Sequence, residues 1–263
     1  MSTRNSSAPA AAESDSRERI AGLEKGLAII EAFGSSRPLL TLSEAARITG
    51  LSRASARRCL LTLEHLGYAE YDGKYFRLAP RVLRLGHAYL TSTPVPKAVQ
   101  PVLETLSERS GESASVAILD GTDIVFIARS TTRRSLSVGV GVGTRLPAYC
   151  AATGRVMLAA GTDAAAREAL RAMPLRKLTP KTLTGLGELL EAIRAARAQG
   201  YAIGDEEIEL GLRVIAVPVV DSTGRTVAAM SLAAQTKRMT RGEMVERLLP
   251  VLESGRRMLA SAL

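Results

Sequence analysis

Four arginines and no acidic residue lie between positions 47 and 58, in a stretch that otherwise has the composition of an apolar helix. A guanidinium group can bind phosphate oxygens, and it can also donate two parallel hydrogen bonds to the edge of a guanine. An isolated arginine on a helix is usually a solvated surface charge. Whether this cluster can bind nucleic acid therefore depends on the secondary structure that surrounds the arginines.

The surrounding pattern predicts three short helices. Apolar residues recur at helical spacing from Leu23 to Phe33, and Thr41 or Ser43 can begin a second helix that Gly50 ends. Ser52 can cap a third helix, whose apolar arc comprises Ala56, Cys59, Leu60, Leu63 and Leu66. The opposite arc carries Ala54, Arg57, Arg58, Leu61 and His65. Two helices joined by a short glycine turn, with a basic start to the second, are typical of a helix-turn-helix.

A hairpin should follow the third helix. Asp72-Gly73 lies between two short alternating runs and is a strong signal for a tight turn. This hairpin would be the wing of a winged helix-turn-helix, because its basic residues could reach phosphate or the minor groove of double-stranded DNA. The residues predicted to contact DNA are Ser52, Arg53, Ser55, Arg57, Arg58, Lys74 and Arg77.

Composition limits the class of protein. A chain of 263 residues is long enough for two domains, and 35 Lys and Arg against 26 Asp and Glu give a net charge of +9, which suits a polyanionic partner. Two distant cysteines provide no disulfide framework or zinc spacing, so we expect a reducing, cytoplasmic setting. Residues 1–18 lack the apolar segment of a signal peptide and are predicted to form a disordered tail, and no apolar run reaches membrane-spanning length.

The rest of the chain predicts an α+β fold. We expect the winged helix-turn-helix over residues 19–79, a linker helix over 80–93 and a second domain over 94–263. In that domain three strand-like runs, 113–120, 123–130 and 134–142, favour an antiparallel meander, and three more runs begin at 201, 213 and 226. A cap at Thr153 would begin a helix near Gly154, and a long helix should end the chain.

These segments together resemble the IclR family of bacterial transcriptional regulators. The resemblance covers the chain from about Arg19 to Leu263 and rests on the winged helix-turn-helix, the helix in PRVLRLGHAYL, and the stretches LPAYCAATGRVMLA and ELGLRVIAVPV. The stretches LSRASARRCLLTLEHLGY and VGVGTRLPAYCAATGR are most similar to the branch that controls aromatic-acid catabolism, such as regulators for protocatechuate and 4-hydroxybenzoate.

The resemblance implies a profilin- or GAF-like C-terminal domain that binds a small organic acid, and a homodimer or dimer of dimers on a partly palindromic operator. Small residues before the helix near Gly154 would leave its N-terminal amides accessible to a carboxylate. Val214 and Ala233 are apolar where relatives that bind very small acids have polar groups, which favours a larger, partly apolar acid. The implied effector residues are Ala151, Ala152, Thr153, Gly154, Asp205, Val214 and Ser231.

Arg213 is a further effector candidate, because its guanidinium could bind a carboxylate, although strand alternation could instead direct it to an ion pair with Glu207 or Glu209. The only histidines, His65 and His87, precede the second domain, so no histidine-based nucleophile or metal site is available there. We therefore expect no enzyme activity, no cofactor and no metal. The alternative to an effector-controlled regulator is a DNA-binding protein whose second domain only oligomerises.

Overall fold

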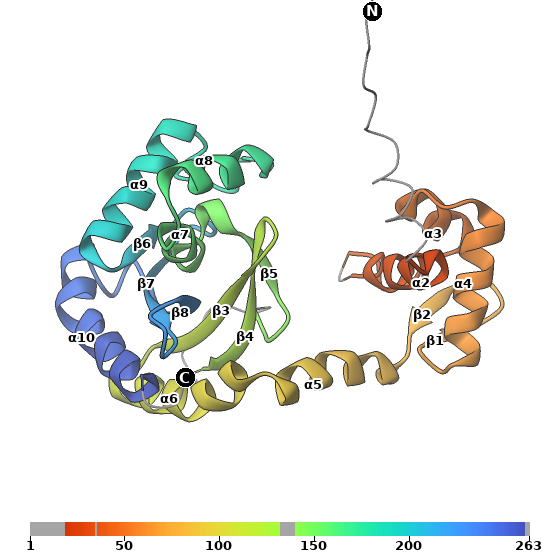
Figure 1. Ribbon diagram of the computed structural model, residues 1–263, viewed down its shortest axis with the longest axis horizontal. Helices are drawn as coiled ribbons and strands as arrows, with labels where there is room; N and C mark the ends of the chain where they lie inside the picture. The colour runs from red at the N-terminus through yellow and green to blue at the C-terminus, as the bar shows by residue number, and fades with distance from the viewer. Residues whose placement is uncertain (1–18, 35, 132–139, 261–263) are drawn as a thin grey trace, which may run out of the picture. The chain divides into compact units, whose positions relative to one another are not determined.

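The computed structural model describes residues 19–34, 36–131 and 140–260, which fall into two compact units divided between His87 and Ala88. Figure 1 shows the elements of each unit. The boundary between the units falls inside helix α5 (Leu83–Ser92). None of the described helices is both long and apolar enough to cross a membrane.

The first unit is a winged helix-turn-helix. Its elements are α2 (Ala21–Glu31), α3 (Leu42–Thr49), α4 (Arg53–His65), β1 (Ala69–Tyr71) and β2 (Phe76–Leu78). Thr41, not Ser43, caps α3, and it does so in a reciprocal capping box with Glu44. Gly50 ends α3 with φ 69°, a left-handed conformation that favours glycine. Ser52 caps α4 by accepting a hydrogen bond from the Ser55 amide, as predicted.

Apolar side chains on one side of each helix hold this unit together. Ile29 of α2, Ala45 of α3 and Leu60 of α4 are fully buried in one cluster that also includes Phe76 of the wing. Ala46 is buried as well, which fits its small size where α3 and α4 pack. The prediction for Leu66 was wrong: this residue follows the last turn of α4 and is 47% exposed, so the buried arc of the helix ends at Leu63.

A helical segment connects the two units. A short 3-10 turn, η1 (Pro80–Val82), leads into α5, and α6 (Pro94–Ser110) begins after a single intervening residue, Thr93. The prolines of STPVP therefore start α6 and do not form an extended break. No residue of α5 is buried among the described residues.

The second unit contains a six-stranded antiparallel sheet with the strand order β5-β4-β3-β8-β7-β6. The strands are β3 (Ser113–Asp120), β4 (Asp123–Ser130), β5 (Arg145–Pro147), β6 (Ala202–Asp205), β7 (Leu212–Val220) and β8 (Thr226–Gln235). Strands β3, β4 and β5 form the predicted meander, but its third strand lies at Arg145–Pro147. The run predicted at 134–142 falls mainly outside the described residues.

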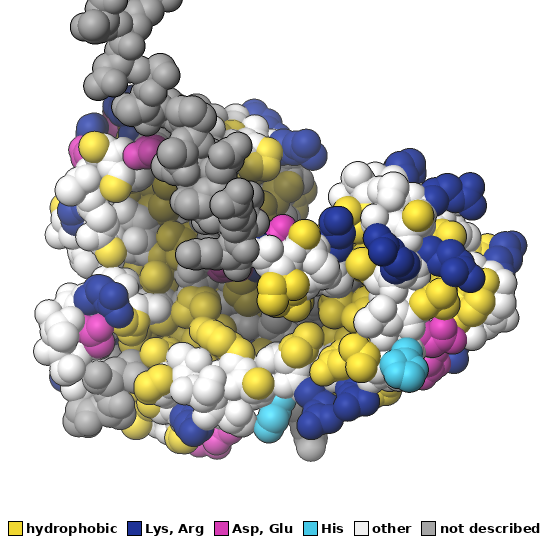
Figure 2. All heavy atoms as spheres, turned by 45° about the vertical axis from the view of Figure 1, so that its right-hand side comes forward, with side chains coloured by type: hydrophobic (Ala, Val, Ile, Leu, Met, Phe, Trp, Pro, Cys, Tyr) yellow, Lys and Arg dark blue, Asp and Glu magenta, His cyan; other side chains and the backbone are white. Residues whose placement is uncertain are grey.

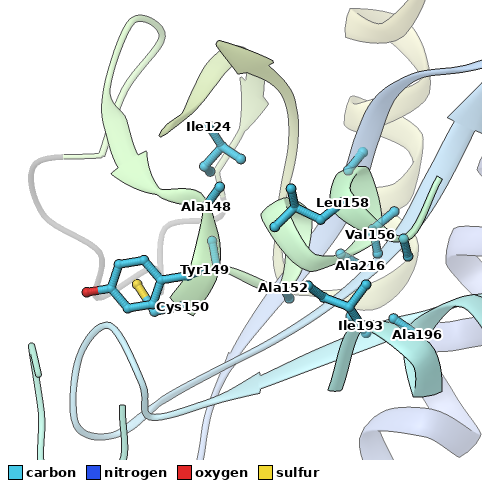
Figure 3. Close-up of a cluster of buried hydrophobic side chains, with 14 of the residues drawn as sticks. Ile124, Ala148, Tyr149, Cys150, Ala152, Val156, Leu158, Ile193, Ala196 and Ala216 are labelled. Carbon is cyan, nitrogen blue, oxygen red and sulfur yellow. The ribbon is translucent and has the colours of Figure 1, made fainter. Parts of the chain in front are cut away.

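Helices cover both faces of this sheet (Figure 1). On one face lie α6 and α10 (Arg241–Leu259), which pack on Val116, Ile215 and Met230. On the other face lie η2 (Ala148–Cys150), α7 (Ala152–Ala159), α8 (Asp163–Ala172) and α9 (Leu186–Gln199). Figure 3 shows the buried cluster on that second face, where Tyr149 and Cys150 precede α7 and Ile193 and Ala196 come from α9.

The start of α7 differs from the prediction. The helix begins at Ala152 and its N-cap is Ala151, which offers no side-chain cap. Thr153 is therefore inside the first turn and not at the cap position. A Cβ at Gly154 would lie 2.1 Å from the Ala148 carbonyl oxygen, so glycine is needed here for the close approach of η2 to α7.

Candidate functional site

The N-terminal part of α4 presents an exposed basic surface. Arg53, Arg57 and Arg58 are exposed, while Ala56 and Leu60 on the opposite side are fully buried in the core of the unit. This division follows from helical periodicity, which directs the apolar arc inward and leaves the arginines to solvent. Figure 2 shows Lys and Arg side chains gathered on the surface of this unit.

The two serines predicted to contact DNA belong to the cap of the same helix. The Ser52 hydroxyl lies 3.1 Å from the Ser55 hydroxyl and accepts a hydrogen bond of 3.2 Å from the Ser55 amide. Ser52 is exposed and Ser55 is half-buried. The cap fixes the first turn of α4, so it also orients the neighbouring arginines.

The wing is a tight hairpin. Asp72 Oδ1 accepts hydrogen bonds from the amides of Lys74 and Tyr75, and these bonds hold the pKa of its carboxyl below the usual value. The Lys74 ammonium is exposed and lies 4.9 Å from the centre of the Tyr75 ring. Arg77 pairs across the two strands with Glu70, at 2.8 Å from Nε and 2.7 Å from Nη2. Both predicted wing cations are therefore exposed, and Arg77 is in addition held by an ion pair with Glu70.

An arginine joins the wing to the end of α4. Arg81 Nη1 donates a hydrogen bond of 2.6 Å to the Leu66 carbonyl, and its guanidinium lies 5.4 Å from the centre of the Tyr68 ring. The carbonyl groups at the end of a helix lack partners within the helix, so this contact satisfies one of them and holds the wing against α4. Sequence reasoning did not single out Arg81.

The second unit contains a cavity of about 90 Å³ between the sheet and the start of α7. Most of its lining is apolar. The described lining residues are Ser115, Ile124, Phe126, Arg129, Val140, Leu146, Cys150, Ala151, Ala152, Thr153, Gly204, Glu207, Ile208, Glu209, Leu212, Val214, Ser231 and Ala233. A concave, mainly apolar site with a few polar groups is the usual form of a small-molecule pocket.

The structure brings together five of the eight predicted effector residues at this cavity: Ala151, Ala152, Thr153, Val214 and Ser231. Three others, Gly154, Asp205 and Arg213, are not among its lining residues. Gly154 packs against η2. Asp205 and Arg213 face each other on the paired strands β6 and β7.

Arg213 is held by partners other than the predicted ones. Its Nε and Nη2 atoms lie 2.9 and 2.8 Å from Asp205 Oδ1, and Nη1 donates a hydrogen bond of 2.7 Å to the Met239 carbonyl. The predicted alternatives, Glu207 and Glu209, were wrong because Asp205 is the cross-strand partner of Arg213 in the sheet register. The arginine side chain therefore stabilises the strand pair and does not line the cavity.

Glu207 takes part in a different ion pair. Arg155 Nη1 and Nη2 lie 2.6 and 2.5 Å from its two carboxylate oxygens, and both side chains are at most 7% exposed. Arg155 Nε also donates to the Tyr149 carbonyl, and the Leu183 amide donates to Glu207 Oε2. This ion pair ties the loop after β6 to α7.

Cys150 forms part of the cavity wall. Burial raises the pKa of its thiol to about 12, and the nearby negative charge of Glu207 acts in the same direction. The thiol is therefore protonated at neutral pH and is a weak nucleophile. Cys150 therefore serves as a packing residue in the wall of the cavity.

A β-bulge determines which residues of β4 face the cavity. Val116 pairs with Ala128 and Ala117 pairs with Phe126, so Ile127 is an extra residue in β4. Both Ile127 and Ala128 pack on the α6 and α10 side of the sheet. Phe126 and Arg129 consequently face the cavity together, although three positions apart they would point to opposite faces of a regular strand.

Sequence reasoning missed Arg129 and Ser115 for this reason. Alternation along an unbroken strand would have placed Phe126 and Arg129 on opposite faces. Ser115 pairs with Arg129 on one side and with Ser231 on the other, so these three cavity residues form one row across β4, β3 and β8. Of these three residues, the sequence analysis predicted only Ser231 as an effector contact.

The chain matches two family descriptions in its two units. Residues 22–73 match the IclR helix-turn-helix domain, and residues 87–259 match the bacterial transcriptional regulator IclR C-terminal domain. A Pca regulon regulatory protein of Pseudomonas putida is 46% identical over 231 residues, which cover 88% of this chain and 79% of that protein. A p-hydroxybenzoate hydroxylase transcriptional activator of Acinetobacter baylyi is 40% identical over 240 residues, which cover 89% of each chain.

A solved structure extends the comparison to a ligand complex. An IclR homologue from Microbacterium hydrocarbonoxydans, solved with 4-hydroxybenzoate, is 25% identical with a TM-score of 0.76, over 92% of this chain and 99% of that one. The curated relatives are regulators of transcription and not enzymes. The two family matches together cover most of the chain, one on the winged helix-turn-helix and one on the unit that contains the cavity, so this chain belongs to the IclR family of bacterial transcriptional regulators.

Proposed function

We propose that this regulator binds a specific DNA operator through α4 and the wing, and that a small aromatic carboxylic acid in the second unit controls this binding. The proposal that an acid controls the regulator rests on the mainly apolar cavity with a few polar groups at the start of α7. The DNA half is supported by the exposed arginines of α4. The proposal deepens the family assignment by naming the residues and the class of effector.

On the DNA side, Arg53, Arg57 and Arg58 contact phosphates and base edges of the major groove, with Ser52 and Ser55 at the start of the same helix. Lys74 and Arg77 contact the DNA backbone from the wing. A bidentate contact between an arginine and guanine contributes roughly 1–3 kcal/mol of discrimination, whereas phosphate contacts add affinity for any sequence.

On the effector side, Ala151, Ala152 and Thr153 at the start of α7 form one wall of the site, and Val214 and Ser231 on the sheet form another. The apolar lining suits an aromatic ring better than a two- or three-carbon acid. Two relatives support this class: one bears p-hydroxybenzoate hydroxylase activation in its name, and another was solved with 4-hydroxybenzoate.

Assembly links the two sites in this proposal. The regulator acts as a homodimer or dimer of dimers on a partly palindromic operator, and the acid changes the spacing between paired wings. Leu83, Leu85 and Tyr89 of α5 are between 40% and 74% exposed, so an apolar surface is available on the connecting helix. The acid must bind one arrangement more tightly than the other, because equal affinity would shift no equilibrium.

The test measures DNA binding and effector binding in the full chain. An operator is first selected from a random DNA library, and its affinity is then measured by fluorescence anisotropy with and without benzoate, 4-hydroxybenzoate, protocatechuate and β-ketoadipate. Thermal unfolding with the same acids reports binding directly, since an acid at about 100 times its Kd stabilises the native state by roughly 2.7 kcal/mol. If acids change neither stability nor operator affinity, the alternative of a second unit that only oligomerises gains support.

A further inference from the structure

We propose that Arg129 is the residue that binds the carboxylate of the effector, with the hydroxyl groups of Ser115 and Ser231 completing the acid-binding end of the cavity. This inference rests on the proposed effector function and specifies which end of the cavity takes the acid group. Among the described residues that line the cavity, Arg129 is the only cation.

The position of these three residues follows from the sheet register. Ser115 pairs with both Arg129 and Ser231, and directly paired residues of antiparallel strands project from the same face. Neighbouring strands are about 4.8 Å apart, so the row from Arg129 to Ser231 spans about 10 Å at the backbone, a distance that the arginine side chain and a bound carboxylate could span together. A planar carboxylate above Ser115 could therefore meet the guanidinium and a serine hydroxyl together.

The environment of the row favours an anion. Ser115 and Ser231 are buried, and Arg129 is half-buried on a strand that runs along the cavity. Burial lowers the pKa of the Arg129 guanidinium, which nevertheless stays charged at neutral pH. A guanidinium that lines the cavity can hold a carboxylate through a charge-assisted bidentate pair.

The hydroxyl of Ser231 has hydrogen-bonding capacity left for a ligand. Within the part of the chain that the structure describes, it donates a long bond of 3.5 Å to the Ser115 carbonyl. A carboxylate oxygen that took this proton would replace a weak contact with a stronger one. The Arg129 backbone is held independently, because Gln100 donates a 3.4 Å bond to its carbonyl, so the ligand would not be needed to form the strand.

The two carboxylates of the cavity do not lie on the three strands that carry this row. Glu207 and Glu209 follow β6, which is separated from β4 by three strands in the sheet order. The charge of Glu207 is compensated by Arg155. An acid bound with its carboxylate at Arg129 would thus place its ring over the apolar strip that includes Phe126, Val214 and Ala233.

The experiment compares an acid with its neutral isostere. Binding of 4-hydroxybenzoate and 4-hydroxybenzamide to the full chain is measured by calorimetry, for the wild type and for Arg129→Gln. We expect the variant to lose roughly 10- to 100-fold in affinity for the acid, the range for a charge-assisted contact, and to bind the amide about as well as the wild type does. Arg145→Gln is the matched control, because Arg145 pairs with Asp123 of the adjacent strand β4 and with Asp120 at the end of β3, and it does not line the cavity.

The outcomes separate this inference from the proposed function. If the wild type binds neither 4-hydroxybenzoate nor any other acid of the panel, the effector proposal fails. If the wild type binds an acid and Arg129→Gln binds it equally well, the effector proposal stands and the role of Arg129 is overturned. Should Arg129→Gln not fold, a crystal structure of the wild-type complex decides: a carboxylate beyond hydrogen-bonding distance of the guanidinium refutes the inference, and a bidentate contact supports it.

Discussion

Arg155 of α7 and Glu207 of the loop after β6 form a buried bidentate ion pair, with N–O distances of 2.6 and 2.5 Å. Glu207 also lines the cavity, so the same carboxylate that ties the loop to α7 forms part of the candidate effector site. Because its partner is fixed by the first turns of α7, this pair sets how the loop closes one end of the cavity. Loss of this ion pair should therefore reduce both the stability of the second unit and its affinity for a ligand.

Replacing Arg155 with Met should destabilise the second unit strongly. Breaking a buried ion pair leaves the other charge without compensation, which typically costs about 3–5 kcal/mol. Urea denaturation followed by circular dichroism would measure the loss. The double variant Arg155→Met, Glu207→Leu should be less destabilised than Arg155→Met alone. A double variant that is less stable than Arg155→Met would show that the uncompensated charge of Glu207 does not cause the destabilisation.

Gly154→Ala should also destabilise the second unit, for a steric reason. A Cβ there would lie 2.1 Å from the Ala148 carbonyl oxygen, and the backbone of η2 would have to move. Overpacking of this kind costs about 1–3 kcal/mol or more. The control is Gly187→Ala in α9, where the added Cβ would meet no atom within 4 Å and helix propensity favours alanine. Equal melting temperatures for the two variants would contradict the expected clash.

The Cys150 thiol should be unreactive in the native protein. Burial raises its pKa to about 12, whereas an exposed thiol titrates near 8.5, so folding favours the protonated form. The protonated thiol therefore contributes its full stability to the folded state below the pKa of the unfolded chain. The free energy of unfolding falls as the pH rises from about 8.5 towards 12. Titration with a thiol reagent at pH 8 should modify Cys150 only after unfolding, with Cys150→Ala used to assign the slow site. Rapid modification of Cys150 in the folded chain would refute the prediction.

Arg57→Ala should weaken operator binding and relax its sequence specificity. If Arg57 contacts a base edge, the loss is roughly 1–3 kcal/mol, and the preference for the selected operator over a mismatched one falls as well. Arg171→Ala is a suitable control, because it removes the same charge from an exposed position of α8 in the other unit. Fluorescence anisotropy at one fixed salt concentration would measure both. Unchanged affinity of Arg57→Ala for the operator would remove α4 as the recognition helix.

The sequence by itself determined the features that depend on local periodicity and turn chemistry. The helix-turn-helix followed from the spacing of Ala56, Leu60 and Leu63, from the cap at Ser52 and from the left-handed turn at Gly50. These signals lie within a few residues of one another, so they survive without knowledge of the tertiary fold. The basic outer face of α4 followed from the same periodicity.

Only the tertiary structure decided the polar contacts of the second unit. Arg213 pairs with Asp205 because the register of β6 and β7 places them opposite each other, and Arg155 reaches Glu207 across 52 positions of the chain. Arg129 faces the cavity because one extra residue, Ile127, changes the alternation of β4. Strand register and bulges depend on pairing between distant segments, so no local pattern in the sequence could have assigned these three arginines to their positions.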